Sequence, residues 1–347
     1  MNSLQCNSSW HSLRHNNPLR FAAGTQPLGR TFTLCIAAWA VLPVTMVAAA
    51  DYPVKPVRIV VPSAPGGGTD FYARLLAQSL TEGLKQTFIV DNRPGAAGNI
   101  GAEAVAKAAP DGYTLMVSAN PAIAINQSLY KKLPYNAERD LAPIARGVVA
   151  PSVFTSHPSI PAKTLPELLA LAKRDPGKLA YGSAGVGTPP HLGVRMLEEA
   201  SKTNFTHVPY KGMGQALTGL MSGEVGFILA DAATVLPHIR AGRVRALAVT
   251  QRIPQLPGVP TQAEAGFPHI EAYTSFSVVA PAATPPAIIQ LLSTEIGKAM
   301  KSTAMKELIE KQAFVAVFDT PEAFGASLKQ ERQMWADVIR RNKITAE

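Results

Sequence analysis

The segment from Val57 to Asp70, VRIVVPSAPGGGTD, constrains this chain most, because an apolar strand runs directly into three consecutive glycines and then into a helix. Apolar residues at spacings of three to five predict that helix over residues 70–82, with Thr69 or Asp70 as its cap. Glycine leaves the backbone open to a guest, and the free N–H groups at a helix start favour a carboxylate or phosphate. The segment therefore predicts an anion-binding corner, although a merely tight strand–helix turn has the same pattern.

Two further corners repeat this arrangement. Residues 179–193, LAYGSAGVGTPPHLG, and residues 206–220, THVPYKGMGQALTGL, each join a predicted strand to a predicted helix through several glycines. Thr188 is placed to cap the first of these helices, which begins at Pro189 and Pro190. Strands of an open α/β sheet share a carboxyl edge where small molecules bind, so the three corners are expected to converge on one ligand.

The N-terminal fifty residues predict an export signal. They contain arginines and no acidic residue, followed by an apolar run over residues 31–47 and by Ala48, Ala49 and Ala50. This pattern is typical of a secretory signal peptide cleaved after Ala50, and the alternative is an N-terminal membrane anchor. No other segment is apolar for long enough to span a bilayer. We therefore expect an exported, periplasmic protein.

Cysteine usage and charge exclude several classes of protein. Both cysteines, Cys6 and Cys35, lie in the predicted leader, so the mature chain contains no disulfide and no thiolate metal site. The formal charge of +9 becomes +6 without the three leader arginines, leaving 30 basic and 24 acidic residues. The basic residues are scattered and form no nucleic-acid-reading motif, so nucleic acid is not an expected partner.

Alternating strands and helices after the leader predict α/β units built on largely parallel sheets. The pattern restarts near Pro151, where Thr164 and Glu167 have the spacing of a capping box for a helix over residues 165–173. Near the C-terminus, helices are predicted over residues 286–301, 303–312 and 321–341. The last helix has a predicted buried face formed by Phe324, Leu328, Trp335 and Ile339.

Most catalytic chemistry lacks support in this sequence. Around Ser183 the order is Tyr181, Gly182, Ser183, Ala184, Gly185, which does not match the G-x-S-x-G nucleophile elbow of hydrolases. The chain has no zinc or calcium ligand spacing, and APGGGTD matches neither common nucleotide-binding loop. We therefore expect no catalytic residue, no metal and no cofactor. Hydrogen-bond donors without a reactive centre suit the capture of a ligand more than its conversion.

Segments spread over the whole mature chain resemble the extracytoplasmic solute receptors of tripartite tricarboxylate transporters, also called Bug proteins. The similar segments are YPVKPVRIVVPSAPGGGTD, VDNRPGAAGNIGAEAVAKAAPDGYTL, NQSLYKKLPYNAERDLAPIA, LAYGSAGVGTPPHL, THVPYKGMGQAL, LPHIRAGRVRALAVT and LPGVPTQAEAGF. The resemblance implies a two-lobed Venus-flytrap fold with a mostly parallel sheet in each lobe. Lobe 1 would comprise residues 51–150 and 276–347, lobe 2 would comprise residues 151–275, and ligand would bind in the cleft.

The resemblance also implies which residues hold the ligand. The first glycine loop would bind a carboxylate, the two other corners would contribute from the opposite lobe, and Asp231 would select the distal end of the ligand. The implied ligand-binding residues are Ala64, Gly66, Gly67, Gly68, Thr69, Asp70, Asn126, Ser183, Gly185, Gly187, Thr188, His191, Tyr210, Lys211, Gly212 and Asp231. The segment ANPAIAIN, residues 119–126, departs from the more polar family pattern, as does Gly226. A less polar specificity pocket is therefore expected.

Taken with the resemblance, these features predict a monomeric periplasmic receptor. It would capture a small carboxylate and deliver it to a membrane permease made of a large and a small subunit. Two alternatives remain open at this stage. The same fold could present ligand to a membrane signalling protein, or the chain could be a periplasmic hydrolase that uses Ser183 with a histidine.

Overall fold

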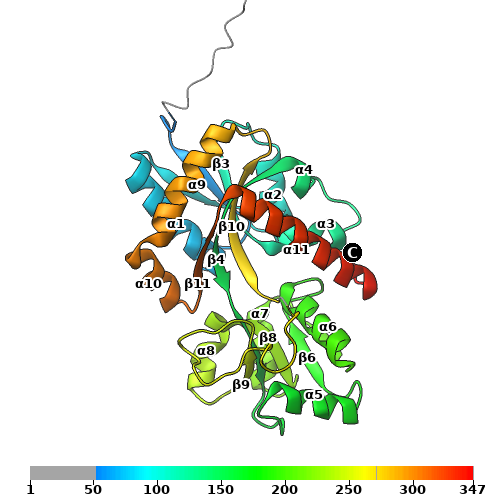
Figure 1. The fold of residues 1–347 in the computed structure, drawn as a ribbon. Coiled ribbons are helices and arrows are strands. Elements are labelled where there is room, and N and C mark those ends of the chain that lie inside the picture. The colour runs from blue at the N-terminus through cyan, green and yellow to red at the C-terminus, as the bar shows by residue number, and fades with distance from the viewer. Residues whose placement is uncertain (1–51, 271, 347) are drawn as a thin grey trace, which may run out of the picture. The chain divides into compact units, whose positions relative to one another are not determined.

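The computed structural model describes residues 52–270 and 272–346, and the predicted signal peptide lies outside them. Two β-sheets organise this part of the chain (Figure 1). A six-stranded sheet has the order β11-β4-β10-β3-β1-β2, and a five-stranded sheet has the order β7-β6-β8-β5-β9. The first sheet takes its strands from two separate parts of the sequence, and the second takes its strands from the part between them.

The six-stranded sheet is covered by helices on both faces. Its strands are β1 (Val57–Val61), β2 (Phe88–Asn92), β3 (Thr114–Ala119), β4 (Leu141–Ala150), β10 (Thr274–Pro281) and β11 (Val315–Asp319). One face carries α1 (Gly68–Leu84), α9 (Pro286–Lys301) and α10 (Thr303–Lys311). The other carries α2 (Asn99–Ala106), a π-helical turn η3 (Pro121–Ile125), α3 (Asn126–Leu129), α4 (Ala137–Asp140) and α11 (Pro321–Arg341). A short 3-10 turn, η2 (Ala96–Gly98), precedes α2.

The five-stranded sheet is built in the same way. Its strands are β5 (Ser152–Ser156), β6 (Ala180–Ser183), β7 (Thr206–Pro209), β8 (Phe227–Asp231) and β9 (Arg245–Val249). Helices α5 (Leu165–Arg174) and α6 (Pro189–Ser201) pack on one face, and α7 (Met213–Met221) and α8 (Ala232–Arg240) pack on the other.

Burial on both faces explains why the strands are continuously apolar. In β1, Ile59 packs into the core under α1 and α9, while the next residue, Val60, packs into the opposite core with α2 and α11. In β8, Leu229 and Ile228 divide between two cores in the same manner. A strand covered by helices on both sides needs apolar side chains at every position, in contrast to the alternation of a half-exposed strand.

The α/β fold with two helix-flanked sheets is confirmed, but both sheets are mixed where mostly parallel sheets were predicted. β1 pairs in parallel with β2 and β3, whereas β10 is antiparallel to β3 and β4. In the second sheet, β5 is antiparallel to β8 and β9. The reason is topological. The chain leaves the first sheet along β4, enters the second along β5 after Pro151, and returns along β10, so these strands are not joined by the crossover helices that keep strands parallel.

Several predicted elements are confirmed in their bounds. Helices α9 and α11 begin and end as predicted, and the four predicted face residues of α11 are buried. Thr164 caps α5, with its Oγ1 accepting from the Glu167 N–H at 3.3 Å. The predicted cap of α1 is wrong: the helix begins at Gly68 after Gly67, and neither Thr69 nor Asp70 caps it with a side-chain hydrogen bond.

Helix α11 supplies a large part of the core on its face of the first sheet. Trp335 is fully buried among residues of η3 and α3, and its Nε1 donates to Glu331 at 3.1 Å. Replacing such a ring by a methyl group removes apolar contacts and leaves a cavity.

We expect Trp335→Ala to lower the free energy of unfolding by about 3–5 kcal/mol, as is usual for truncating a buried aromatic residue. Urea denaturation followed by circular dichroism measures this change. Lys329→Ala, at an exposed position of the same helix, is the control and should change stability by less than about 0.5 kcal/mol. Equal effects of the two substitutions would contradict the assigned core.

Candidate ligand-binding site

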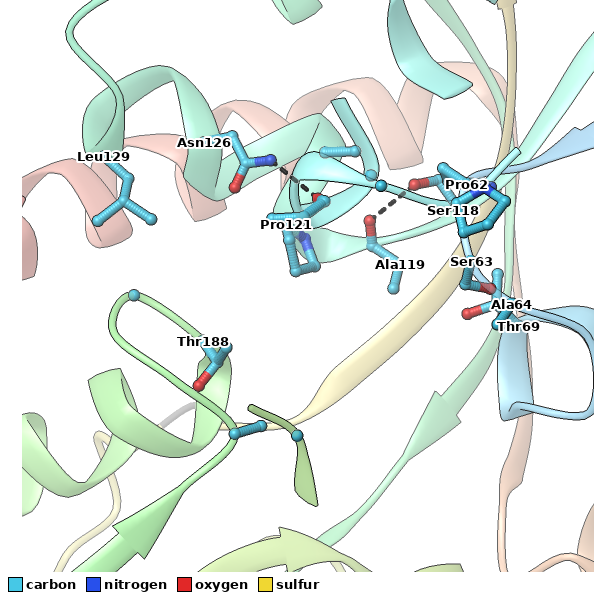
Figure 2. Close-up of a pocket in the computed structure, with 18 of the residues that line it drawn as sticks. Pro62, Ser63, Ala64, Thr69, Ser118, Ala119, Pro121, Asn126, Leu129 and Thr188 are labelled. Atoms are coloured by element: carbon cyan, nitrogen blue, oxygen red, sulfur yellow. Dashed lines mark hydrogen bonds between the residues drawn. The ribbon is translucent and has the colours of Figure 1, made fainter. Parts of the chain in front are cut away.

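A cavity of about 650 Å³ lies where loops of both sheets meet (Figure 2). Loops that follow β1, β2 and β3, together with η3 and α3, form one wall. Loops that follow β6 and β7 form the other. The lining residues are Pro62, Ser63, Ala64, Thr69, Pro94, Gly95, Ala97, Gly98, Ser118, Ala119, Pro121, Ala122, Asn126, Leu129, Tyr130, Ala184, Val186, Gly187, Thr188, Lys211 and Gly212. Its volume is in the range of small-molecule sites.

The first glycine corner is held in shape by Asp70. The Asp70 carboxylate accepts from the Gly66 N–H, from Arg74 Nε and from Asn92 Nδ2, each at 2.9 Å. Burial by itself would raise the pKa of Asp70, but the hydrogen bonds from Arg74, Gly66 and Asn92 outweigh it and lower the pKa to about 2. Asp70 is therefore a charged anchor of the loop. It is not among the residues that line the cavity.

This anchoring leaves hydrogen-bond donors directed at the cavity. Ser63 and Thr69 line it, and the Oγ atom of Ser63 is buried without a hydrogen-bond partner among the described residues. The first turn of α1 adds N–H groups, which have no acceptor within a helix and carry its positive dipole end. Buried polar atoms normally find a partner, so an unpartnered hydroxyl beside a cavity indicates a place for a ligand or water.

Gly68 has a packing role in the core of the first sheet. A Cβ atom there would come within 2.9 Å of Phe276 Cζ and of Phe314 Cζ, both in the core of the first sheet. Glycine is needed at this position so that the start of α1 can approach the two rings. Gly66, with φ of +87°, is the residue of this loop that requires glycine for its backbone conformation.

The wall formed by η3 and α3 is fixed from behind by α11. Arg332 Nε donates to the Ile123 carbonyl at 2.9 Å, and Arg332 also donates to the Ala137 carbonyl at 3.0 Å. Asn120 donates from its amide to Glu331 and accepts from the Ser275 N–H at 2.5 Å. These contacts hold the π-helical turn over residues 121–125, a conformation frequent at functional sites.

Asn126 connects this wall to the loop after β2. Its Nδ2 donates to the Ala97 carbonyl at 3.1 Å and to Asn99 Oδ1 at 2.6 Å. Ala96 and Ala97 have φ values of 47° and 53°, a left-handed backbone conformation that residues other than glycine rarely adopt. Strained backbone of this kind is found preferentially at binding sites, because the surrounding contacts hold it in place.

On the side of the second sheet, His191 shapes the loop before α6. Its Nδ1 accepts from the Gly187 N–H at 3.0 Å. The His191 ring stacks on His207, with 4.1 Å between ring centres. Burial lowers the pKa of His191 to about 3 and that of His207 to about 4, with repulsion between the two rings adding to the effect at His191. Both rings are therefore neutral at physiological pH, and they support the loop from outside the cavity lining.

Ser183 belongs to the same support. It is fully buried, its Oγ lies 2.7 Å from His207 Nε2, and it accepts from the Gly185 N–H at 3.1 Å. The loop places Thr188 in the lining and uses the Thr188 hydroxyl to donate to the Gly185 carbonyl at 2.7 Å. Thr188 stands at the predicted capping position of α6 but makes no side-chain cap there.

The third corner contributes Lys211 and Gly212 to the lining, immediately before α7. Tyr210 precedes them, but its ring packs against Gly219 and Gly182 and does not line the cavity. Among the described residues that line the cavity, Lys211 has the one charged side chain. It brings a positive charge to the side opposite the first glycine corner.

The structure thus brings seven of the predicted residues to one cavity: Ala64, Thr69, Asn126, Gly187, Thr188, Lys211 and Gly212. The others lie next to it or elsewhere and are Gly66, Gly67, Gly68, Asp70, Ser183, Gly185, His191, Tyr210 and Asp231. Asp231 lies at the end of β8, where it accepts from Thr274 Oγ1 at 3.2 Å. Burial raises its pKa to about 6, against the opposing effect of its hydrogen bonds.

Sequence reasoning missed a large part of the lining. The loop after β2, residues 94–98, is not among the predicted ligand-binding residues, although its Pro-Gly-Ala-Ala-Gly composition lets the backbone come close to a ligand. Leu129 and Tyr130 were also missed, and so were Ser118 and Val186. A short apolar segment has no local signal that separates a ligand-facing residue from a core residue.

Within residues 52–270 and 272–346, no group of three or more histidine, cysteine, aspartate or glutamate side chains is arranged to hold a metal ion. The helices in the same ranges are all too short or too polar to cross a bilayer. The described site therefore offers hydrogen bonds, one cation and apolar surface to a ligand.

Comparison with known proteins gives a consistent picture. The family model TctC, described as "Tripartite tricarboxylate transporter family receptor", matches residues 72–344 of this chain. Protein BugT of Bordetella pertussis is 38% identical over 297 residues, which cover 85% of this chain and 91% of BugT.

Solved structures share the fold. The Rpa4515 protein of R. palustris, solved with adipate, is 32% identical with a TM-score of 0.75, covering 85% of this chain and 99% of its own. The periplasmic binding protein BugD is 31% identical with a TM-score of 0.72, and the match covers 85% of this chain and 100% of BugD. MatC from Rhodopseudomonas palustris, solved with bound malate, is 29% identical with a TM-score of 0.71, and the match covers 83% of this chain and 100% of MatC.

The anchoring role of Asp70 predicts a pH-dependent contribution to stability. Its pKa is lower in the folded protein than the ordinary 3.8, so the stabilisation is present above about pH 4 and is lost as the pH falls through about 2. We expect Asp70→Asn to lower the free energy of unfolding by about 2 kcal/mol at pH 7, with the difference shrinking towards pH 2. Urea denaturation across this range measures it, and Glu82→Gln on the same helix is the control. A difference that does not vary with pH would rule out the charged anchor.

Proposed function

Because the chain belongs to the tripartite tricarboxylate transporter receptor family, we propose that it captures a small carboxylate in the cavity between its sheets and delivers it to a membrane permease. The proposal includes export to the periplasm, action as a monomer, and a permease made of a large and a small subunit. It also assigns the two sheets to two lobes, with boundaries near residues 150 and 275.

The observation that carries the proposal is the set of donors without partners at the cavity. Ser63, with its unpartnered hydroxyl, and Thr69, in the first turn of α1, line it on one side, and Lys211 lines it on the other. A carboxylate accepts several hydrogen bonds and carries the charge that a helix start and a lysine favour. Proteins of this fold have been solved with adipate and with malate, both carboxylates.

Two walls from different sheets also suit a receptor that closes on its ligand. A ligand that touches both walls binds the closed arrangement more tightly than an open one, and so shifts the population towards closure. Gly187 supports close approach of the walls, because a Cβ atom there would collide with the side chain of Leu129 on the opposite side. Closure would then mark the loaded receptor for its membrane partner.

The distance between Ser183 and His207 is the one observation that favours a hydrolase. Two features weigh against that function. Ser183 is fully buried and does not line the cavity, and its hydroxyl is engaged with the backbone of Gly185. A nucleophile must reach the substrate carbonyl. We therefore propose that the pair supports the loop, and we expect no turnover of p-nitrophenyl esters by the purified protein.

A thermal-shift screen tests carboxylate capture. Protein purified from cells that express the full chain is mixed with hexanoate, benzoate, adipate and citrate, and with hexanamide and benzamide as uncharged controls. A ligand at a hundredfold excess over its Kd adds about 2.7 kcal/mol of stability, so we expect a higher Tm with at least one carboxylate and none with the amides. Equal shifts with acids and amides, or no shift at all, would refute the proposal.

The role of Lys211 is tested by Lys211→Met, which keeps the length of the side chain and removes its charge. We expect about tenfold weaker binding of the carboxylate that gives the largest thermal shift, because one charge-assisted contact is lost. Isothermal titration calorimetry measures the Kd at two salt concentrations, and the salt dependence should fall in the variant. Lys329→Met, on α11, is the control; a similar loss there would assign the effect to overall charge.

A further inference from the structure

The described side chains that line the cavity carry positive charge and no negative charge. Among the described lining residues, Lys211 supplies a single positive charge and no aspartate, glutamate, histidine or arginine side chain is present. Asp70 is the nearest acidic residue to the first glycine corner in sequence, and its carboxylate is already neutralised by Arg74 and two further donors. A ligand ammonium group would find no counterion here, and burying an unpaired charge is costly.

The cavity also has two chemically different ends. Figure 2 shows Ser63, Ala64 and Thr69 at one end and Leu129 with Asn126 at the other, with Pro121 between them. The first end has the unpartnered Ser63 hydroxyl and the start of α1. The second end has the aliphatic side chain of Leu129. Gly187 packs against Leu129, so the neighbouring Val186 belongs to this end as well.

Three polar groups near the second end, on Asn126, Thr188 and Gly187, have already donated their hydrogens. Asn126 gives both amide hydrogens to Ala97 and Asn99, and Thr188 gives its hydroxyl hydrogen to the Gly185 carbonyl. The Gly187 N–H donates to His191. What Asn126 and Thr188 still offer is acceptor oxygen atoms. Tyr130, next to Leu129, adds one neutral donor, its hydroxyl. A second carboxylate at this end would therefore find a single neutral donor among acceptor oxygens and apolar side chains, whereas a methyl group, an aromatic ring or a ligand hydroxyl would be tolerated.

From this division, and resting on the proposed function, we propose that the ligand is a monocarboxylate with an apolar body and no ammonium group. Its carboxylate lies at the Ser63 end, where Lys211 of the opposite wall is the one lining cation that can act as its countercharge, and its apolar body extends towards Leu129 and Val186. Dicarboxylates of the same length bind more weakly, because their second carboxylate is desolvated with one neutral donor, the Tyr130 hydroxyl, and without a second cation in the lining. Amino acids bind more weakly still, because their ammonium group has no anion to pair with.

Three six-carbon acids test the proposal directly. Hexanoate, adipate and 6-aminohexanoate share a chain length and differ only in whether the far end is a methyl, a carboxylate or an ammonium group. Benzoate and terephthalate form a second matched pair with a rigid body. Isothermal titration calorimetry with protein from cells expressing the full chain should give a Kd for hexanoate, or for benzoate, at least about tenfold lower than for its charged counterparts.

A substitution at the far end should reverse the preference. Val186 is 42% exposed, so Val186→Lys adds a cation there without disturbing a core. We expect the variant to bind adipate or terephthalate about tenfold more tightly than the unmodified protein does, with hexanoate and benzoate unchanged or weaker. Val186→Leu, which keeps the end apolar, is the matched control and should retain the preference for monocarboxylates.

The outcomes separate this inference from the function it rests on. Tighter binding of a monocarboxylate, reversed by Val186→Lys and not by Val186→Leu, supports the proposal. Tighter or equal binding of adipate, terephthalate or 6-aminohexanoate by the unmodified protein overturns it and leaves carboxylate capture standing. Silence of all five acids overturns the monocarboxylate proposal, and carboxylate capture falls with it when the thermal-shift screen, which also contains citrate, is silent too.

Discussion

The Asn120 side chain connects the cavity wall formed by η3 and α3 to β10, the strand by which the chain returns to the first sheet. This buried amide follows β3, accepts from the Ser275 N–H of β10, and donates to Glu331 of α11. One side chain therefore joins the cavity wall, the strand that returns from the second sheet, and the longest helix. Because buried polar groups must be paired, loss of Asn120 would take this acceptor from the Ser275 N–H, while Glu331 would keep the hydrogen bond from Trp335.

Helix α11 extends this constraint in two directions. Towards the first sheet, Arg332 holds the carbonyls of the π-helical turn that forms the wall. Towards the second sheet, Arg341 and Asn342 bind Glu199 of α6, with 3.0 and 2.6 Å to its carboxylate, and Leu192 of α6 packs in the core of α11. Since α6 begins at the opposite wall, both walls of the cavity are attached to one helix pair.

Different residues support the loops of the site and line its cavity. Asp70, His191 and Ser183 are polar residues of the kind that often carry chemistry, yet here they use their hydrogen bonds to fix backbone loops. The cavity lining itself consists of small residues, apolar residues, uncharged polar residues such as Asn126 and Tyr130, and Lys211. Rigid loops of this kind present the same lining to a ligand each time, which lowers the entropic cost of binding.

Sequence alone determined the local parts of this protein. The bounds of α9 and α11, the buried face of α11 and the Thr164 cap follow from periodicity and capping, which act between residues a few positions apart. The three glycine corners follow from runs of glycine between a strand and a helix, which is also a local pattern. Sequence did not reveal β4 and β5, which flank Pro151 with no helical or alternating pattern, or the antiparallel pairing that results from crossing between sheets. It also did not show that Asp70 faces its own loop, or that Leu129 meets Gly187. The contact between Leu129 and Gly187 joins residues 58 positions apart, and the role of Asp70 depends on the direction of one side chain. Only the packed structure decides such features.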